Sequence, residues 1–214
     1  MARRHWQNWD APGVVDWLDA DWPGLPVDPT LSSLVDLVEI HHGSGPILEV
    51  GCGTGRTHEA LMRRLVLRPH GYVGIDVTPA MVERARARYP QADFRTGDLL
   101  ALPFADGSFG SVVCTDVLQH LPELEAPLAE MLRVAREHVF LLLWLRKADA
   151  PRRPPELVPI EVPEHGVRTS FLEVTWSDEE VIAACRAGGG EVLDFQVVDG
   201  AGHDLGLVRV GVAR

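Results

Sequence analysis

The sequence contains few cysteines and no long hydrophobic run. Its three cysteines, Cys52, Cys114 and Cys185, lie far apart and form no Cys-x-x-Cys pair. This spacing argues against a disulfide framework and a cysteine-based metal site, and it favours a reducing compartment. The longest apolar run, residues 139–145, is far too short to cross a bilayer, and residues 1–10 lack the apolar core of a secretory signal. The histidines show no metal-ligand spacing either, so we expect a cytoplasmic protein with no bound metal and no membrane segment.

Basic residues are also scarce. Lys and Arg number 20 against 31 Asp and Glu, which gives a net charge of −11, and acidic residues prevail at both ends of the chain. Because no large basic face is evident, a nucleic-acid substrate is disfavoured. A hydrophobic fraction of 46% is ordinary for a globular protein, and 214 residues suffice for one sizeable core. We predict a single domain over residues 1–214.

Glycine is concentrated where the chain is most informative, in residues 47–56 (ILEVGCGTGR). A short apolar strand carries Glu49 near its end and then runs into Gly51, Gly53 and Gly55. Residues without a Cβ allow positive φ angles and let the backbone lie against a ligand. The segment therefore predicts a turn that holds a small polar ligand.

The same loop lacks the marks of a phosphate site. A dinucleotide fingerprint would place its third glycine at position 56, where this chain has Arg56. No Gly-Lys-Ser/Thr follows, as a P-loop would require. Glu49 would repel a phosphate but can pair, directly or through water, with an ammonium group. These features favour a zwitterionic ligand.

Four motifs in order resemble those of the class I S-adenosylmethionine-dependent methyltransferases, in particular the small-molecule methyltransferases. They are EVGCGTG at 49–55, YVGID at 72–76, FRTGDL at 94–99 and FGSVVCTDVLQHL at 109–121. The resemblance implies that the acidic residue of the second motif grips the ribose hydroxyls, that the aspartate of the third meets the adenine amino group, and that the fourth flanks the transferred methyl. It covers about residues 45 to 145.

The resemblance also implies the cofactor S-adenosylmethionine, the product S-adenosylhomocysteine and a small-molecule methyl acceptor. The cofactor-binding residues that we expect are Glu49, Gly51, Cys52, Gly53, Gly55, Asp76, Val77, Met81, Asp98, Leu99 and Thr115. Simpler roles compete for three of them: Asp76 as the cap of the next helix, Asp98 as a turn former and Met81 as a core residue.

His120 is the candidate catalytic residue, because it follows the fourth strand and titrates in the range of a general base for a hydroxyl or amine. Substrate placement or a local hydrogen bond is the alternative role. Asp116 and Glu123 are lesser candidates. The motif lacks the Asn/Asp-Pro-Pro-Tyr/Phe pattern of enzymes that methylate amino groups of bases, peptides or amides, which counts against those substrates.

Alternating strand and helix patterns predict an α/β fold with a doubly wound, mostly parallel sheet. The resemblance gives seven strands, a Rossmann-like methyltransferase fold and a C-terminal antiparallel hairpin. The expected strands are 47–50, 72–76, 93–96, 111–115, 139–145, 192–198 and 205–212. The expected helices are 31–41, 54–67, 79–89 and 125–134, together with one that starts at the capping box of 177–180 and stops at Gly188.

Two segments outside this regular core are possible lids over the site: the N-terminal arm and helix, 1–42, and the proline-rich insertion 146–176. The arm carries four tryptophans. We expect Trp17 and Trp22 to pin it to the core, whereas Trp6 and Trp9 either do the same or face an aromatic acceptor.

Two other functions compete with a methyltransferase. One is a catalytically inactive partner subunit that binds S-adenosylmethionine. The other, disfavoured by Arg56 and Glu49, is a nicotinamide-dependent oxidoreductase. Either a monomer or a homodimer fits the sequence.

Overall fold

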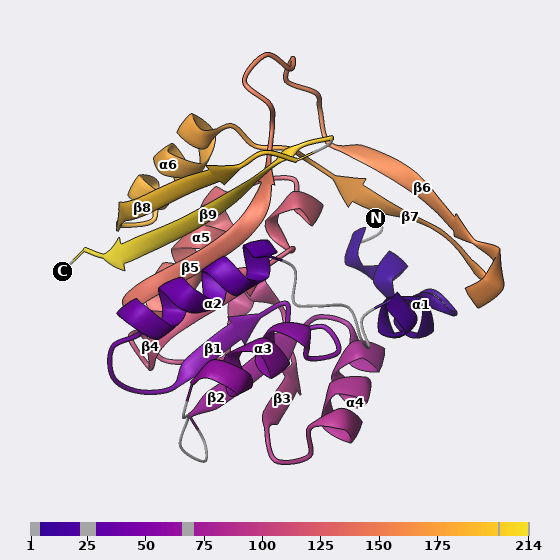
Figure 1. The fold of residues 1–214 in the computed structure, drawn as a ribbon, viewed down its shortest axis with the longest axis horizontal. Coiled ribbons are helices and arrows are strands. Elements are labelled where there is room, and N and C mark those ends of the chain that lie inside the picture. Colours follow the sequence, from indigo (N-terminus) through magenta and orange to yellow (C-terminus); the bar gives the residue numbers. More distant parts are fainter. Residues whose placement is uncertain (1–4, 22–28, 66–70, 201, 214) are drawn as a thin grey trace.

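A seven-stranded sheet forms the centre of the protein, with helices on both faces (Figure 1). The computed structural model describes residues 5–21, 29–65, 71–200 and 202–213. The strands of this sheet are β1 (Ile47–Val50), β2 (Tyr72–Asp76), β3 (Asp93–Thr96), β4 (Phe109–Thr115), β5 (Ala135–Leu145), β8 (Gly190–Val198) and β9 (Asp204–Val212).

The strand order is β3-β2-β1-β4-β5-β9-β8. The first five strands pair in parallel, whereas β9 lies antiparallel to both β5 and β8. The order reverses between β1 and β4, and this is the point at which open α/β sheets bind their ligands. The predicted doubly wound sheet with a C-terminal antiparallel hairpin is confirmed.

The helices and the second, two-stranded sheet complete the fold. The α-helices are α1 (Val14–Asp21), α2 (Pro29–His41), α3 (Arg56–Arg64), α4 (Pro79–Arg88), α5 (Glu125–Val134) and α6 (Asp178–Ala187). Short 3-10 helices are η1 (His5–Asp10), η2 (Leu99–Ala101), η3 (Leu118–His120) and η4 (Pro163–His165). The second sheet pairs β6 (Glu156–Val162) with β7 (Val167–Glu173) in antiparallel register.

Alternation along the strands divides the core into two layers. In β1, Leu48 and Val50 point to the layer that α5 and α6 cover, while Ile47 points to the layer of α2, α3 and α4. All three side chains are at most 2% exposed. A sheet that is buried on both faces explains why the central strands are apolar throughout.

Local signals set most helix boundaries. Thr78 and Pro79 start α4, and the capping box between Ser177 and Glu180 starts α6, as predicted. The helix expected at 54–67 is shorter in the structure, where α3 begins at Arg56 and ends at Arg64. Its N-cap is Gly55, which has a φ of 93°, so the residues before it belong to the turn. Residues 66–70 lie outside the described part.

The insertion at 146–176 is more regular than expected, because β6 and β7 lie within it. Val167 and Phe171 of β7 pack against Val14 of α1 and Met81 of α4. The N-terminal arm and the small sheet thus form one layer beside the carboxyl ends of the main strands (Figure 1). That these segments act as lids stays a prediction.

Ion pairs fasten the arm to the core. Arg84 of α4 contacts Asp16, at 2.6 Å, and Asp19 of α1, and Arg88 lies 3.0 Å from Asp19. Asp19 is 7% exposed, so its charge depends on these partners. The arm is therefore anchored on α4, the helix that follows Asp76.

His58 gives the stability of the fold a defined pH dependence. Its ring is 5% exposed and packs among Tyr72, Tyr89 and Phe94, at centroid distances of 4.4, 4.9 and 5.4 Å. Burial lowers the pKa of His58 from 6.5 to about 4, against a smaller opposite effect of Glu59. Between these two pH values the unfolded chain binds a proton that the folded chain does not. We expect stability to fall by about 2 kcal/mol as the pH falls through this window.

Urea unfolding at several pH values between 7 and 4 measures this loss. A His58→Phe variant keeps an aromatic ring and removes the titrating group, so it should lose less stability over the same range. If both proteins lose the same free energy of unfolding, His58 is not the group responsible.

Candidate functional site

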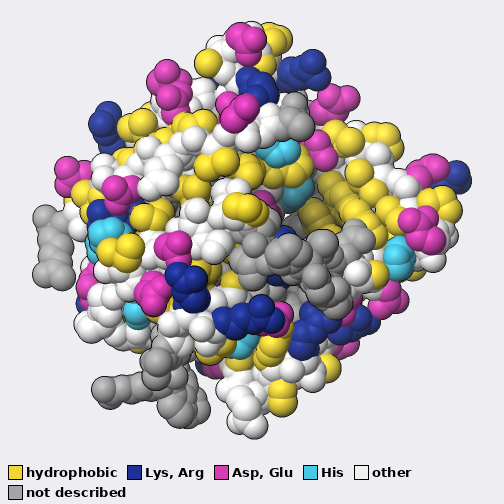
Figure 2. Space-filling model, in the orientation of Figure 1, with side chains coloured by type: hydrophobic (Ala, Val, Ile, Leu, Met, Phe, Trp, Pro, Cys, Tyr) yellow, Lys and Arg dark blue, Asp and Glu magenta, His cyan; other side chains and the backbone are white. Residues whose placement is uncertain are grey.

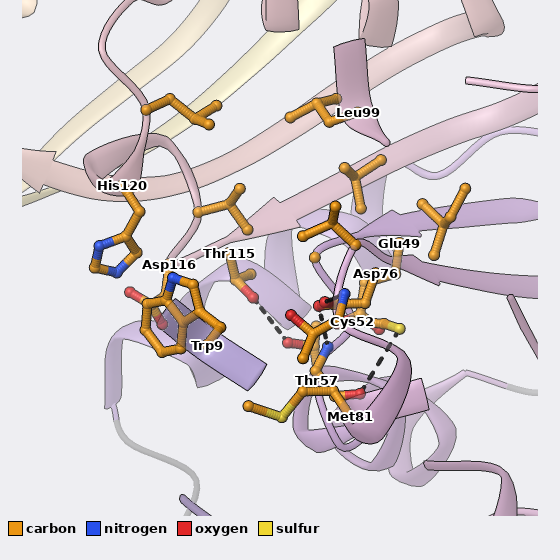
Figure 3. A pocket seen from close by; sticks show the side chains of 18 of the residues that line it. Trp9, Glu49, Cys52, Thr57, Asp76, Met81, Leu99, Thr115, Asp116 and His120 are labelled. Carbon is orange, nitrogen blue, oxygen red and sulfur yellow. Dashed lines mark hydrogen bonds between the residues drawn. The ribbon is translucent and has the colours of Figure 1, made fainter. Parts of the chain in front are cut away.

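A cavity of about 670 Å³ lies at the carboxyl ends of β1, β2 and β4, where the strand order reverses (Figure 3). Its volume falls in the range of small-molecule sites. The predicted site residues that line it are Glu49, Gly51, Cys52, Gly53, Asp76, Val77, Met81, Asp98, Leu99, Thr115 and His120. Gly55 is absent from this lining and serves the turn before α3.

The glycine loop holds the backbone close to the cavity. Gly51 has a φ of 75° and Gly53 has a φ of 50°, and residues with a Cβ rarely adopt such angles. The amides of Gly51 and Cys52 both donate to the carbonyl of Ile75, at 2.8 and 3.1 Å. A Cβ on Gly51 would lie 2.1 Å from Cγ2 of Val117. Glycine is therefore required at position 51 for both conformation and space.

Asp76 joins the loop to the next helix. Its Oδ2 accepts a hydrogen bond from the amide of Gly53, at 2.9 Å, and its Oδ1 accepts one from the amide of Thr78, at 2.8 Å. Burial raises the pKa of Asp76, while these bonds from Thr78 and Gly53 lower it. The N-cap of α4 is Thr78 and not Asp76, so Asp76 orders the turn before the helix, and the same carboxylate also lines the cavity.

Glu49 is a buried acid at the floor of the cavity. It is 1% exposed, and the hydroxyl of Tyr72 donates to its Oε2. Burial raises the pKa of Glu49 to about 8, although hydrogen bonds from Tyr72 and Thr57 act in the opposite direction. At neutral pH the side chain is therefore mainly protonated, and a cationic ligand group would favour its ionisation.

The far wall is largely apolar. Met81 and Leu99 are 4% and 8% exposed and lie beside Val77 in the lining. Asp98 Oδ1 accepts the amide of Leu100 at 2.9 Å, so the turn-forming role of Asp98 is realised. An apolar slot with a carboxylate at its end suits a flat ring that carries a donor group.

His120 lies at the opposite end from this slot. Its Nδ1 is 2.7 Å from the carbonyl oxygen of Leu172, which can only accept, so Nδ1 carries the proton. Burial lowers the pKa of His120, with a smaller opposing effect from this bond. The ring is therefore neutral near pH 7, and Nε2 keeps its lone pair.

The rings of Trp9 and Trp144 both lie close to this histidine, and Figure 3 shows that of Trp9. The centroid of Trp9 is 4.8 Å from that of His120, and the centroid of Trp144 is 5.8 Å from it. Both indoles line the cavity. Trp17 packs against a cluster that joins the arm to Met81 of α4 and Phe171 of β7, as expected for a residue that pins the arm to the core. The side chain of Trp6 is not described, and Trp22 lies outside the described residues.

Asp116 and Gln119 add polar atoms between the two ends of the cavity. Asp116 has a φ of 56°, which is unusual for a residue with a side chain and typical of functional turns. Gln119 is fully buried, and its Oε1 has no hydrogen-bond partner among the described residues. This oxygen is an available acceptor for a ligand.

The sequence analysis missed several lining residues, among them Thr57, Gln119 and Trp144. Thr57 Oγ1 lies 2.9 Å from Thr115 Oγ1 and supports the cavity floor. Trp144 looks like one more apolar residue of a central strand. It borders the cavity because β5 extends past the end of β4, where the last pair is Thr115 with Leu142.

Figure 2 shows hydrophobic side chains gathered over β6 and β7 beside a hollow in this face. Within the described part of the chain, no group of three or more His, Cys, Asp or Glu side chains is arranged to hold a metal ion. Nor is any described helix long and apolar enough to span a bilayer.

Comparison with known families matches residues 48–143 to a methyltransferase domain. Among curated relatives, a probable S-adenosylmethionine-dependent methyltransferase of Mycolicibacterium smegmatis is 37% identical over 176 residues, covering 78% of this chain and 63% of that protein. The 2-methyl-6-phytyl-1,4-hydroquinone methyltransferase of Synechocystis is 32% identical over 136 residues, covering 61% of this chain and 40% of that protein. The chain thus spans less than two thirds of the length of either relative.

A solved structure gives the same fold over the whole chain. Magnesium protoporphyrin IX methyltransferase from Synechocystis, with S-adenosylmethionine bound, superposes with a TM-score of 0.68 and 15% identity. The match covers 97% of this chain and 94% of the other. At this identity the likeness concerns the fold.

Proposed function

From the premise that the chain belongs to the class I S-adenosylmethionine-dependent methyltransferases, we propose that it transfers a methyl group from S-adenosylmethionine to a small-molecule acceptor. One observation carries the proposal. Glu49 and Asp76 face one cavity from the ends of adjacent strands, beside a loop that brings its backbone against that cavity. An ammonium group and a pair of hydroxyls match these two acids.

The remaining lining residues fit the same cofactor. Val77, Met81 and Leu99 would enclose the adenine, and Asp98 would accept its amino group. When bound, S-adenosylmethionine supplies a methyl group activated by a positively charged sulfur. The chain itself has to bind and orient the two reactants and to exclude water from them. Where the acceptor is protonated, the chain also has to take up a proton.

His120 is the residue that we propose for this proton. Its Nε2 is the unprotonated ring nitrogen, since Nδ1 is engaged by Leu172, and the ring borders the cavity. A fixed tautomer and a lowered pKa together keep a base available at neutral pH.

Calorimetric titration with S-adenosylhomocysteine, and separately with NADH, tests the proposal. We expect saturable binding of the first and none of the second. Acceptors are then screened with S-adenosylmethionine that carries an isotopically labelled methyl. Binding without transfer to any acceptor would favour the inactive partner subunit, and preferential binding of NADH would contradict the proposal.

Glu49 should make cofactor binding depend on pH. Its pKa of about 8 means that an ammonium group has to compete with a proton for the carboxylate. We expect the affinity for S-adenosylhomocysteine to fall below pH 8, approaching tenfold per pH unit. Calorimetry between pH 6 and 8.5 measures this slope.

A Glu49→Gln variant is the matched control, because it keeps the size of the side chain and cannot ionise. Its affinity should be lower at pH 8 and nearly constant over the same range. A wild-type affinity that does not change with pH would show that the ligand does not engage the ionised Glu49.

The proposal also covers the size of the acceptor, the cellular compartment and the oligomeric state. The hydroquinone methyltransferase of Synechocystis is consistent with a small acceptor rather than a macromolecule. All three cysteines are buried and unpaired, which agrees with a reducing compartment, and we propose the cytoplasm. Sedimentation would distinguish a monomer from a homodimer.

A further inference from the structure

Two indoles at the acceptor end of the cavity are each stacked on another ring. Trp9 stacks on Phe171 with a centroid distance of 3.9 Å and an angle of 24°. Trp144 stacks on His203 at 4.0 Å and 19°. Both indoles also line the cavity, so each presents part of its ring to a bound ligand. Such surfaces bind flat aromatic rings well.

The indoles come from distant parts of the chain and meet at one histidine. Trp9 lies in the N-terminal arm, Trp144 near the end of β5, and His120 lies within 6 Å of both by ring centroid, at 4.8 and 5.8 Å. The neighbouring lining residues Leu121 and Pro122 are apolar. Nδ1 of His120 is engaged by Leu172. Among the described contacts, Nε2 has no protein partner.

We propose that the acceptor is an uncharged aromatic compound with a hydroxyl group on its ring. The ring lies against Trp9 and Trp144, and the hydroxyl reaches Nε2 of His120. This inference rests on the proposed function and narrows it to one substrate class. Asp116 also faces the cavity, where it accepts a long hydrogen bond from Gln119, at 3.4 Å, so the test below includes a cationic amine as a competing probe.

The transfer step then balances. The hydroxyl O–H bond breaks and its proton passes to Nε2 of His120. A bond forms between the ring oxygen and the methyl carbon, while the carbon–sulfur bond breaks and its electron pair stays on sulfur. The products are an aryl methyl ether and S-adenosylhomocysteine, and the imidazolium releases its proton to solvent.

A binding experiment tests this without turnover. The full chain is saturated with S-adenosylhomocysteine and titrated calorimetrically with three probes of similar size: 2-naphthol, its saturated analogue decahydro-2-naphthol, and the cationic 2-(aminomethyl)naphthalene. We expect 2-naphthol to bind about tenfold more tightly than either of the others, as two aromatic contacts would provide. Equal or tighter binding of the saturated alcohol or the amine overturns the inference.

Variants locate the binding surface. Trp9→Leu and Trp144→Leu should each weaken 2-naphthol binding about three- to tenfold, whereas Trp9→Phe should retain most of it. Trp17→Leu is the matched control, because Trp17 belongs to the same arm and packs on the same cluster as Trp9 but is not part of the cavity lining, so it should leave the 2-naphthol affinity unchanged. Unchanged 2-naphthol affinity in the Trp9→Leu variant also overturns the inference.

The titration with S-adenosylhomocysteine distinguishes failure of the proposed function from failure of the aromatic acceptor. If S-adenosylhomocysteine itself does not bind, the proposed function fails and this inference fails with it. If S-adenosylhomocysteine binds but the three probes are not distinguished, only the aromatic acceptor is wrong.

Discussion

Replacing His120 with alanine is expected to lower kcat by about 10²- to 10⁴-fold, the usual contribution of a general base. Nε2 is the unprotonated ring nitrogen at the acceptor end of the cavity, and the variant removes it. Cofactor affinity should change little, because Glu49 and Asp76 are untouched. Single-turnover kinetics with a methyl acceptor, together with calorimetry, measures both quantities.

The pH profile distinguishes a base from a residue that only places the substrate. Because burial lowers the pKa of His120, wild-type kcat should be constant near neutral pH and should decline only on the acid side of 6.5. The alanine variant should lose this decline, and added imidazole should restore part of its rate. A raised KM with a normal kcat would instead indicate substrate placement.

Asp76→Ala is expected to weaken S-adenosylhomocysteine binding by about 1–3 kcal/mol, or roughly five- to 150-fold. The variant lacks the carboxylate that we propose to contact the ribose hydroxyls. The amides of Gly53 and Thr78 would also lose the acceptor that orders them. Isothermal titration measures the change, and circular dichroism with thermal unfolding verifies that the variant is folded.

Two further variants interpret that result. Asp76→Asn keeps the size of the side chain and one accepting oxygen, so its loss should be smaller. Asp93→Ala removes an acid from the adjacent strand β3, at the end remote from the cavity, and should leave the affinity unchanged. If Asp76→Ala binds as tightly as the wild type, Asp76 does not hold the cofactor.

The cofactor side of the molecule was predictable from sequence because its determinants are local. Glycines spaced by two after an apolar strand specify a turn of positive φ angles, and the chain forms that turn at Gly51, Gly53 and Gly55. An acid at the end of β2 then lies beside this turn, since parallel strands end at one edge of the sheet. The order of the glycine loop and β2 along the chain was therefore enough to predict that the loop and Asp76 lie side by side.

The acceptor side was not predictable in the same way. Its surface joins Trp9 of the N-terminal arm, His120 of η3 and Trp144 of β5, and Trp9 in turn rests on Phe171 of β7. Prolines in the insertion suggested an irregular segment, yet Pro159 lies within β6, whose outer side is unpaired and does not need every amide. Trp144 carried no signal, because an apolar residue in a central strand normally packs in the core.

The arm and the small sheet come from opposite ends of the chain, and this separation has a consequence during synthesis. The side chain of Asn8 donates to the carbonyl of Ser170 across 162 positions. A growing polypeptide that has just left the ribosome through β4 already contains Glu49 and Asp76, but Trp9 has no Phe171 to rest on. The wall of the cavity that carries Trp9 can therefore be completed only after translation has passed β7, so the two sides of one cavity form at different times.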